Sequence, residues 1–260
     1  MSSTHRIDRR EHGTCWIVLT RPEKHNAFDE TLIAGLTGAI ADLGRDASCA
    51  AIVLAAEGKS FSAGADLDWM RRAAAQPRQT NLADAAALAG LMQALDTVPK
   101  PTIAAVQGPA YGGGVGLVAC CDVAIATPAC TFALSEVRLG LIPAVISPYV
   151  IAAIGARASR RYFQTAEPIP AAEALRIGLV HDVVAADALE ARVLAIAAEL
   201  RKGAPGAKAG AKALIAEVTS MAPGAARNSL TAGRIADTRA GAEAKEGLAT
   251  FFARRKPSWS

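Results

Sequence analysis

The chain has 260 residues and a mass of 26.7 kDa, which suits one large domain or a domain with an appended lobe. Hydrophobic residues make up 52% and charged residues 20% of the sequence, and this composition excludes a disordered, collagen-like or disulfide-rich chain. The net charge of +4 is too small for a surface that follows a nucleic-acid backbone, so no specific nucleic-acid partner is expected.

The sequence carries no signal for a metal site, a disulfide framework or a membrane span. Its five cysteines lack CxxC spacing, and its four histidines form no HxxxH pair or Cys/His cluster. The N-terminus lacks the apolar core of a secretory signal, and the most apolar stretch, residues 101–126, contains Gln107, Asp122 and a run of glycines. We therefore expect a cytoplasmic protein in a reducing compartment, with no metal and no contact with a membrane.

The first expected elements are a hairpin, a helix and a strand. Strand patterns at residues 7–10 and 15–20 flank a glycine-containing turn and predict the hairpin. Asp29 can cap a helix whose apolar residues recur at helical spacing up to about residue 44. Residues 51–55 then form an apolar run that predicts a buried strand.

Helices are expected to interrupt the next strands. A helix that begins at residues 67–72 should break near residues 76–77, and a second helix at residues 82–97 is ended by prolines. A strand at residues 102–106 leads into a glycine-rich turn and a helix around residues 115–120.

Strand and helix patterns thus alternate through the first two thirds of the chain, with further strands at residues 123–126 and 131–133. This alternation predicts an α/β fold with a sheet and crossover helices. Strand signals nearly vanish from residue 147 onward, and helices are expected at residues 171–176, 188–202, 207–218, 228–239 and 243–254. We therefore expect a core of residues 1–203 and a helical lobe of residues 204–260.

Two glycine-containing turns are candidates for chemistry, FSAGAD at residues 61–66 and GPAYGGGVG at residues 108–116. Each follows a buried strand and precedes a helix, so each places unpaired backbone N–H groups at a helix N-terminus. Two such turns that converge would bind a carbonyl oxygen that becomes negative during a reaction. The same glycines would be needed if the turns only let helices pack closely on strands.

Glu136 is the leading candidate for proton transfer. It follows a strand and has mostly apolar neighbours, and partial desolvation would raise its pKa. The alternative is an exposed loop glutamate. Arg138 could pair with Glu136, bind an anionic substrate tail or lie on the surface. Asp66 and Asp122 lie at element ends, where capping would be enough to explain them.

Five segments in this order resemble the crotonase family, also called the enoyl-CoA hydratase/isomerase superfamily. They are residues 21–27, 61–66, 108–114 with 121–122, 135–143 and 252–257. The resemblance implies a spiral of ββα units with a helical C-terminal lobe that makes a homotrimer or a dimer of trimers. It also implies an acyl-CoA thioester as substrate, with no cofactor beyond the coenzyme A that the substrate carries.

The resemblance also assigns residues. It implies an oxyanion hole from the N–H groups of Ala65 and Gly113, with Glu136 as the catalytic acid or base. It further implies that two loops and the basic tail of a neighbouring subunit bind CoA. The binding residues carried over in this way are Lys24, Ala27, Ala63, Asp66, Leu67, Arg138, Phe252 and Arg255.

One position departs from the family pattern. Typical hydratases of the family carry two glutamates that share a water molecule, and the first would fall at Gly116, where this chain has no carboxylate. Residues 136–149 and 154–163 are similar to bacterial hydratases of 3-methylglutaconyl-CoA and isohexenylglutaconyl-CoA, which act in leucine and terpene breakdown. Their substrates carry a distal carboxylate, which would give Arg138 a role.

The sequence therefore favours an enoyl-CoA hydratase that uses one glutamate. A 3,2-enoyl-CoA isomerase remains an alternative because it needs only one glutamate to move a proton between carbons. A non-catalytic CoA-binding scaffold, which has lost the first acid, is the alternative from another functional class.

Overall fold

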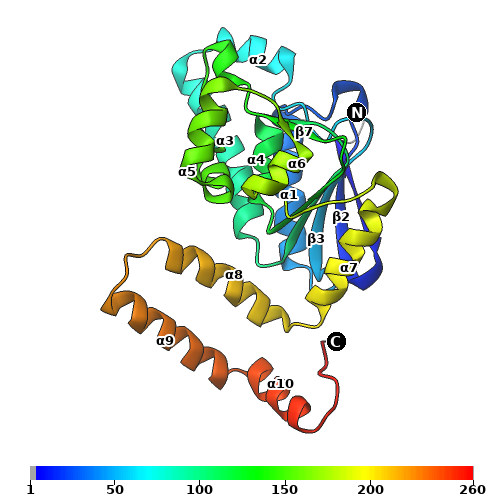
Figure 1. The fold of residues 1–260 in the computed structure, drawn as a ribbon, viewed down its shortest axis with the longest axis vertical. Coiled ribbons are helices and arrows are strands. Elements are labelled where there is room, and N and C mark those ends of the chain that lie inside the picture. Colours follow the sequence, from blue (N-terminus) through cyan, green and yellow to red (C-terminus); the bar gives the residue numbers. More distant parts are fainter. Residues whose placement is uncertain (1–3, 260) are drawn as a thin grey trace.

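The computed structural model describes residues 4–259, and its centre is a six-stranded sheet (Figure 1). Strands β1 and β2 are antiparallel and form the expected hairpin, while every later pair in this sheet is parallel. In sheet order the strands are β1 (His5–Arg10), β2 (Thr14–Leu19), β3 (Ala51–Ala56), β4 (Thr102–Val106), β6 (Val123–Ala126) and β9 (Asp182–Val183).

A second layer of short strands accompanies the large sheet. It contains β5 (Ala110–Tyr111), β7 (Thr131–Ala133) and β8 (Ile169–Pro170). Isolated bridges between Phe28 and Ala65, and between Ser62 and Ala110, continue the same layer. Each of β2, β3, β4 and β6 is therefore followed by a short stretch of this layer and then by a helix. This repeat is the expected ββα spiral, and the α/β class is confirmed.

Seven α-helices surround the sheets in the core, and four short 3-10 helices lie in the connections (Figure 1). The α-helices are α1 (Glu30–Arg45), α2 (Leu67–Ala74), α3 (Arg78–Thr97), α4 (Gly113–Cys120), α5 (Ser147–Thr165), α6 (Ala171–Ile177) and α7 (Leu189–Arg201). The 3-10 helices are η1 (Glu11–Gly13), η2 (Pro22–Lys24), η3 (Glu136–Leu139) and η4 (Ala186–Ala188).

Both faces of the large sheet are covered, as its parallel strands require. Successive side chains of a strand point to opposite faces. On β2, Ile17 belongs to the main core cluster, to which α1 contributes Leu32 and Leu36, whereas Trp16 belongs to the cluster on the other face, to which α7 contributes Val193. Burying one such aliphatic side chain stabilises a fold by roughly 1.5–3 kcal/mol, so both clusters hold the helices on the sheet.

Local sequence patterns predicted several helix boundaries correctly. The Asp29 side chain accepts a hydrogen bond from Leu32 N at 2.9 Å and caps α1. The expected break near residues 76–77 is present, since α2 ends at Ala74 and α3 begins at Arg78. Helix α3 therefore begins four residues before the expected residue 82.

Three elements of the last third of the chain were not predicted from the sequence. Helix α5 was not predicted, and its regular pattern is interrupted at Gly155, which has φ 75° and ψ 159°. Strands β8 and β9 were not predicted either, because each has two residues and depends on pairing with distant β7 and β6. Helices α5 and α7 contribute Val150 and Val193 to the core clusters, so both helices pack on the sheets.

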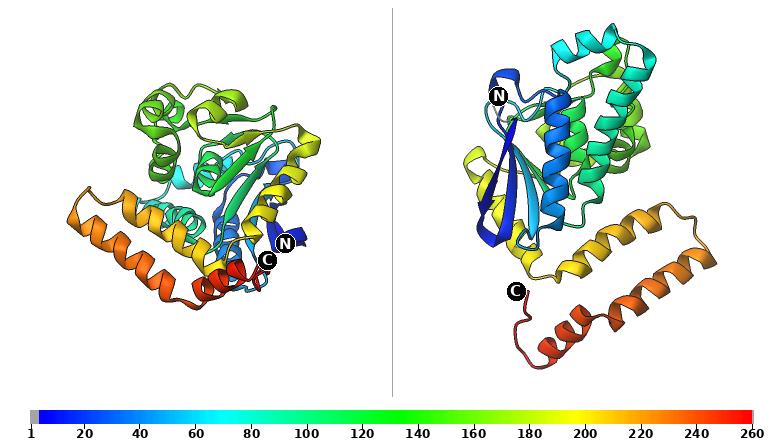
Figure 2. Two further views of the ribbon diagram at one scale, coloured as in Figure 1. Left: turned by 60° about the horizontal axis from the view of Figure 1, so that its bottom comes forward. Right: turned by 180° about the vertical axis from the view of Figure 1, so that it is seen from behind.

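Three helices extend away from the sheets (Figures 1 and 2). They are α8 (Pro205–Thr219), α9 (Ala225–Ala240) and α10 (Ala242–Phe252). Helices α8 and α9 bury none of their residues, and Phe252 is 79% exposed. Lys212 Nζ lies 2.9 Å from Asp122 Oδ2 and joins α8 to the core. The division at residues 203 and 204 stays a prediction. Among the described helices, none is both long and apolar enough to cross a membrane.

Candidate active site

The two glycine-containing turns lie side by side in the structure. Tyr111 N donates a hydrogen bond to Ser62 O at 2.9 Å, and Phe61 N donates to Pro109 O at 2.9 Å. The turns follow β3 and β4, which are parallel neighbours, so both emerge at the same edge of the sheet. The structure thus brings together two segments that are almost fifty residues apart in the sequence.

Glycine is required where the turns touch. A Cβ atom on Gly64, which has φ +81°, would lie 2.8 Å from Tyr111 O. A Cβ atom on Gly114 would lie 2.7 Å from Ser62 O. Real Cβ atoms do not approach backbone oxygens this closely, so a side chain at either position would push the turns apart. Close packing, the simpler explanation of these glycines, is therefore part of their role.

The same turns leave two backbone N–H groups without acceptors. Phe28 N donates to Gly64 O at 2.7 Å and Asp66 N donates to Phe28 O at 2.8 Å, so the intervening Ala65 N–H points away from Phe28. Gly113 is the first residue of α4, whose first N–H groups have no partner within the helix. Among residues 4–259, neither Ala65 N nor Gly113 N donates a hydrogen bond.

Phe28 connects the two N–H groups. Its backbone forms the bridge to Ala65, and its ring lies under Gly113, where an added Cβ atom would be 3.0 Å from Phe28 Cε2. Phe28 is only 1% exposed. A fully buried aromatic side chain has little freedom to move, so it fixes the position of one N–H group relative to the other.

Glu136 lies beside the second turn, at the start of η3. A Cβ atom on Gly112 would be 3.1 Å from Glu136 Oε1, which places the carboxyl group next to the N-terminus of α4. Glu136 Oε2 is buried and has no hydrogen-bond partner in the described part of the chain. Burial raises the pKa of Glu136, while a hydrogen bond from its own backbone lowers it to a smaller extent. A carboxyl group with a raised pKa is a stronger base when ionised and is suited to accept and return a proton.

Because its pKa is raised in the fold, Glu136 is expected to make stability depend on pH. The protonated form of Glu136 contributes to the stability of the fold. This contribution is fully present below the pKa of the unfolded chain and is lost as pH rises through the pKa of the folded chain. We expect Glu136→Gln to raise the free energy of unfolding at pH 7, with a smaller gain at pH 4, as measured by denaturant titration. Glu23→Gln, which changes an exposed glutamate, is the control; an equal gain at both pH values for Glu136→Gln would contradict the prediction.

The position of the missing first glutamate is filled by apolar side chains. A Cβ atom on Gly116 would lie 3.0 Å from Ile146 Cβ and 3.2 Å from Met92 Cε, and closer still to Ile146 Cγ2. Gly116, Ile146 and Met92 are all buried. A glutamate at residue 116 would therefore require the surrounding core to rearrange. The packing of Ile146 and Met92 explains why this position is a glycine.

Arg138 does not pair with Glu136 in the described chain. It is exposed, and its guanidinium donates a hydrogen bond to Ala166 O at 2.9 Å, at the end of α5. A role for Arg138 in binding a substrate carboxylate stays a prediction.

The proposed CoA-binding loops meet at Asp66. Its carboxylate accepts hydrogen bonds from Asp68 N and Trp69 N, at 2.9 and 3.0 Å, and so caps α2. Lys24 Nζ donates to Asp66 Oδ2 at 3.0 Å. Burial acts to raise the pKa of Asp66, but the hydrogen bonds from Trp69 and Lys24 outweigh it and the pKa is lowered. Asp66 thus remains ionised and joins the two loops. The other residues assigned to these loops are buried Ala27, half-buried Ala63 and exposed Leu67.

Asn26 is a positioning residue that the sequence analysis missed. It is fully buried, and its side chain accepts from Arg21 N at 2.9 Å. The same side chain donates to Glu57 O at 2.9 Å and to Ser60 O at 3.0 Å. These bonds hold the loop of residues 21–27 against the first turn. Asn26 is part of a segment that carries the family resemblance, but the two carbonyl groups to which it donates lie more than thirty residues away in the sequence.

Phe252 and Arg255 are far from the turns of the same chain. Helix α10 lies at the opposite end of the molecule from α2 (Figures 1 and 2). Both residues are exposed. The structure therefore does not bring them to Glu136 within one chain, and any contact with a ligand at the turns would involve a second copy.

The enoyl-CoA hydratase/isomerase family model matches residues 9–260. The chain belongs to this family. Among solved structures, an enoyl-CoA hydratase from Shewanella pealeana is 44% identical, with a TM-score of 0.95 over 98% of this chain and 96% of that one. AtuE from Pseudomonas aeruginosa is 36% identical, with a TM-score of 0.93 over 98% and 99% of the two chains.

Curated relatives of this enoyl-CoA hydratase/isomerase family member include enzymes with different names. Enoyl-CoA hydratase AKT6-1 from Alternaria alternata is 35% identical over 254 residues, which cover 95% of this chain and 81% of the relative. 4-Chlorobenzoyl coenzyme A dehalogenase-2 from Arthrobacter sp. is 34% identical over 202 residues, which cover 76% and 73% of the two chains. The expected family and the expectation of an enzyme are confirmed.

Proposed function

We propose that the chain is a cofactor-independent enoyl-CoA hydratase that adds water across the 2,3 double bond of an enoyl-CoA thioester. The observation that carries the proposal is the pair of free N–H groups of Ala65 and Gly113, together with a Glu136 carboxyl group whose Oε1 lies against Gly112 and whose Oε2 is buried and unpartnered. The hydratase names of AKT6-1 and of the Shewanella structure support it.

The two N–H groups would bind the thioester carbonyl oxygen. They withdraw electron density from the conjugated double bond, and they stabilise the negative oxygen of the enolate that forms when water adds. One donor of this kind is worth about 3–4 kcal/mol of transition-state stabilisation. Because Ala65 and Gly113 donate to no group of the described chain, they need not break a bond to bind substrate.

Glu136 would carry the proton. Its carboxylate takes a proton from water while the hydroxyl oxygen forms a bond to C3, and the C2–C3 π electrons move toward the thioester oxygen. The protonated Glu136 then gives its proton to C2, which restores the carbonyl and completes the addition of H and OH. The raised pKa of Glu136 suits both steps, because it strengthens the carboxylate as a base and keeps the acid form accessible.

The chain would carry out both proton-transfer steps with a single carboxyl group, that of Glu136. The apolar side chains of Ile146 and Met92 occupy the space around Gly116, so no second carboxylate at that position orients the water. A branched substrate with a distal carboxylate, of the methylglutaconyl type, is the proposed acyl group. Its support is the sequence similarity of residues 136–149, and Arg138 would have to leave Ala166 O to bind the carboxylate.

A 3,2-enoyl-CoA isomerase is the second candidate, and the packing around Gly116 favours it. An isomerase needs the same two N–H groups and one base that moves a proton between C2 and C4. Incubation with an enoyl-CoA in H₂¹⁸O separates the two reactions by mass spectrometry. We expect one ¹⁸O atom in a 3-hydroxyacyl product, whereas a shifted double bond without label would reject the hydratase.

We also propose that the active form is a homotrimer or a dimer of trimers. The exposed apolar residues of α9 and α10, among them Ile235, Phe251 and Phe252, have no cover within the described chain. A second copy that covers them would bring Phe252 and Arg255 near the CoA nucleotide of its neighbour.

A further inference from the structure

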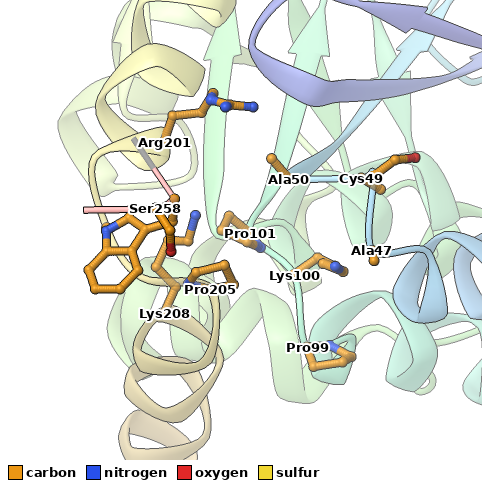
Figure 3. A pocket seen from close by; sticks show the side chains of 13 residues that line it. Ala47, Cys49, Ala50, Pro99, Lys100, Pro101, Arg201, Pro205, Lys208 and Ser258 are labelled. Carbon is orange, nitrogen blue, oxygen red and sulfur yellow. The ribbon is translucent and has the colours of Figure 1, made fainter. Parts of the chain in front are cut away.

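A cavity of about 270 Å³ lies at the end of the large sheet opposite the glycine turns. Figure 3 shows the side chains that line it. Its walls include residues 47–50 and 99–101, which directly precede β3 and β4, whereas the turns follow these parallel strands. The junction of α7 and α8 and the C-terminal pair Ser258 and Trp259 complete the cavity. It is therefore separate from the proposed thioester site of the same chain.

Three cationic side chains from different elements line this cavity. Lys100 precedes β4, Arg201 ends α7 and Lys208 lies in α8 (Figure 3). None of the three forms an ion pair with a carboxylate of residues 4–259. The adjacent Lys202, which does not line the cavity, instead pairs with Glu199 at 2.6 Å.

The positive charges of the cavity act on one another. Burial lowers the pKa of Lys208, and the charges of Arg201 and Lys100 lower it further, while Glu243 raises it. The Glu243 carboxylate is already engaged, since it accepts hydrogen bonds from Gly206 N and Ala207 N at 2.8 and 2.9 Å. Unpaired like charges around a cavity are unfavourable, and an anion between them would relieve the repulsion.

The donors of these cations also remain partly free. Lys100 Nζ donates to Asp46 O at 3.1 Å and Lys208 Nζ donates to Leu200 O at 2.8 Å, so each ammonium group has further N–H bonds available. Arg201 adds a planar guanidinium, which binds two oxygens of one phosphate group well. The C-terminal wall is held in place, because Ser258 N donates to Glu246 Oε1 at 2.6 Å.

We propose that this cavity binds a phosphate group, either inorganic phosphate or a phosphate monoester, through Lys100, Arg201 and Lys208. A phosphate dianion supplies enough acceptor oxygens for all three cations and balances most of their charge. The site is independent of the proposed hydratase reaction, so its test does not use activity.

Isothermal titration with inorganic phosphate, in a phosphate-free buffer of constant ionic strength, tests the site. We expect saturable binding that Lys208→Met weakens at least about tenfold, as for the loss of one hydrogen bond to a charged group. Lys202→Met removes the same charge next to the cavity and is the matched control, with an expected Kd within about threefold of the parent. Lys208→Arg, which keeps the charge, should retain binding and shows that the fold tolerates a change there.

A second titration with glycerol 3-phosphate distinguishes the two sources of the phosphate group. Tighter binding than inorganic phosphate assigns an esterified ligand, and equal or weaker binding assigns the free ion. Saturating enoyl-CoA should leave the phosphate Kd unchanged. The proposal is overturned if phosphate does not bind, if Lys202→Met weakens binding as much as Lys208→Met, or if enoyl-CoA displaces the phosphate.

Discussion

Replacement of Glu136 by glutamine is expected to lower kcat for hydration by about 10²–10⁴ while CoA thioesters still bind. Glutamine keeps the shape of the side chain but cannot take a proton from water or return one to C2. The apolar packing of Ile146 and Met92 around Gly116 leaves no carboxylate there to replace it. Steady-state kinetics give kcat, and titration calorimetry gives the Kd of a saturated acyl-CoA, which should change less than about threefold.

A control variant sharpens this prediction. Glu173→Gln changes a glutamate on α6, outside the turns, that is hydrogen-bonded to Tyr162 of α5 and to Arg176. This variant should leave kcat within about twofold of the parent. Equal activity of Glu136→Gln and the parent would remove Glu136 from the mechanism.

Sequence reasoning was most successful where the signal was local. The cap at Asp29 and the turn of the first hairpin depend on neighbouring residues, and both are present in the structure. Helix α5 was not predicted from the sequence, because its helical geometry is interrupted at Gly155, which has φ 75°. Its apolar face, which contributes Val150 and Ile154, is defined only by packing on the core.

The candidate site shows the same difference between local features, which the sequence predicted, and long-range contacts, which it did not. The glycine pattern predicted both turns, and the apolar neighbours of Glu136 in the sequence predicted that burial raises its pKa, as it does in the structure. The contacts that align the turns join distant parts of the chain, such as Asn26 with Ser60 and the ring of Phe28 with Gly113. No spacing rule reveals such contacts. The sequence also could not predict that the Arg138 side chain points toward Ala166 O, because this depends on where α5 ends.

The two explanations of the glycines are compatible in the proposed mechanism. Gly64 and Gly114 let the turns touch, and this contact leaves the N–H groups of Ala65 and Gly113 free beside Glu136. Under the proposed function, this packing requirement is also a requirement for catalysis. A side chain that separates the turns should therefore reduce activity more than stability alone would explain.

Gly64→Ala is the direct test of this link, and we expect it to lower kcat by about 10²–10³, the effect of losing one oxyanion donor. The new Cβ atom would lie 2.8 Å from Tyr111 O, which is backbone and cannot rotate away, so the turn that carries Ala65 N–H must move. A left-handed φ also costs alanine about 1–2 kcal/mol of stability. Steady-state kinetics and denaturant titration measure the two effects separately.

Gly155→Ala is the control that separates the effect of backbone strain from the effect of moving the turn that carries Ala65 N–H. Gly155 also has a positive φ, +75°, but its added Cβ would meet no heavy atom within 4 Å outside its own helix, and it belongs to α5 and to neither turn. This variant should lose stability while kcat stays within about twofold of the parent, because backbone strain far from the turns leaves both donors in place. If folded Gly64→Ala keeps the parent kcat, the Ala65 N–H does not bind the thioester oxygen, and stabilisation of the enolate must come from Gly113 and other groups.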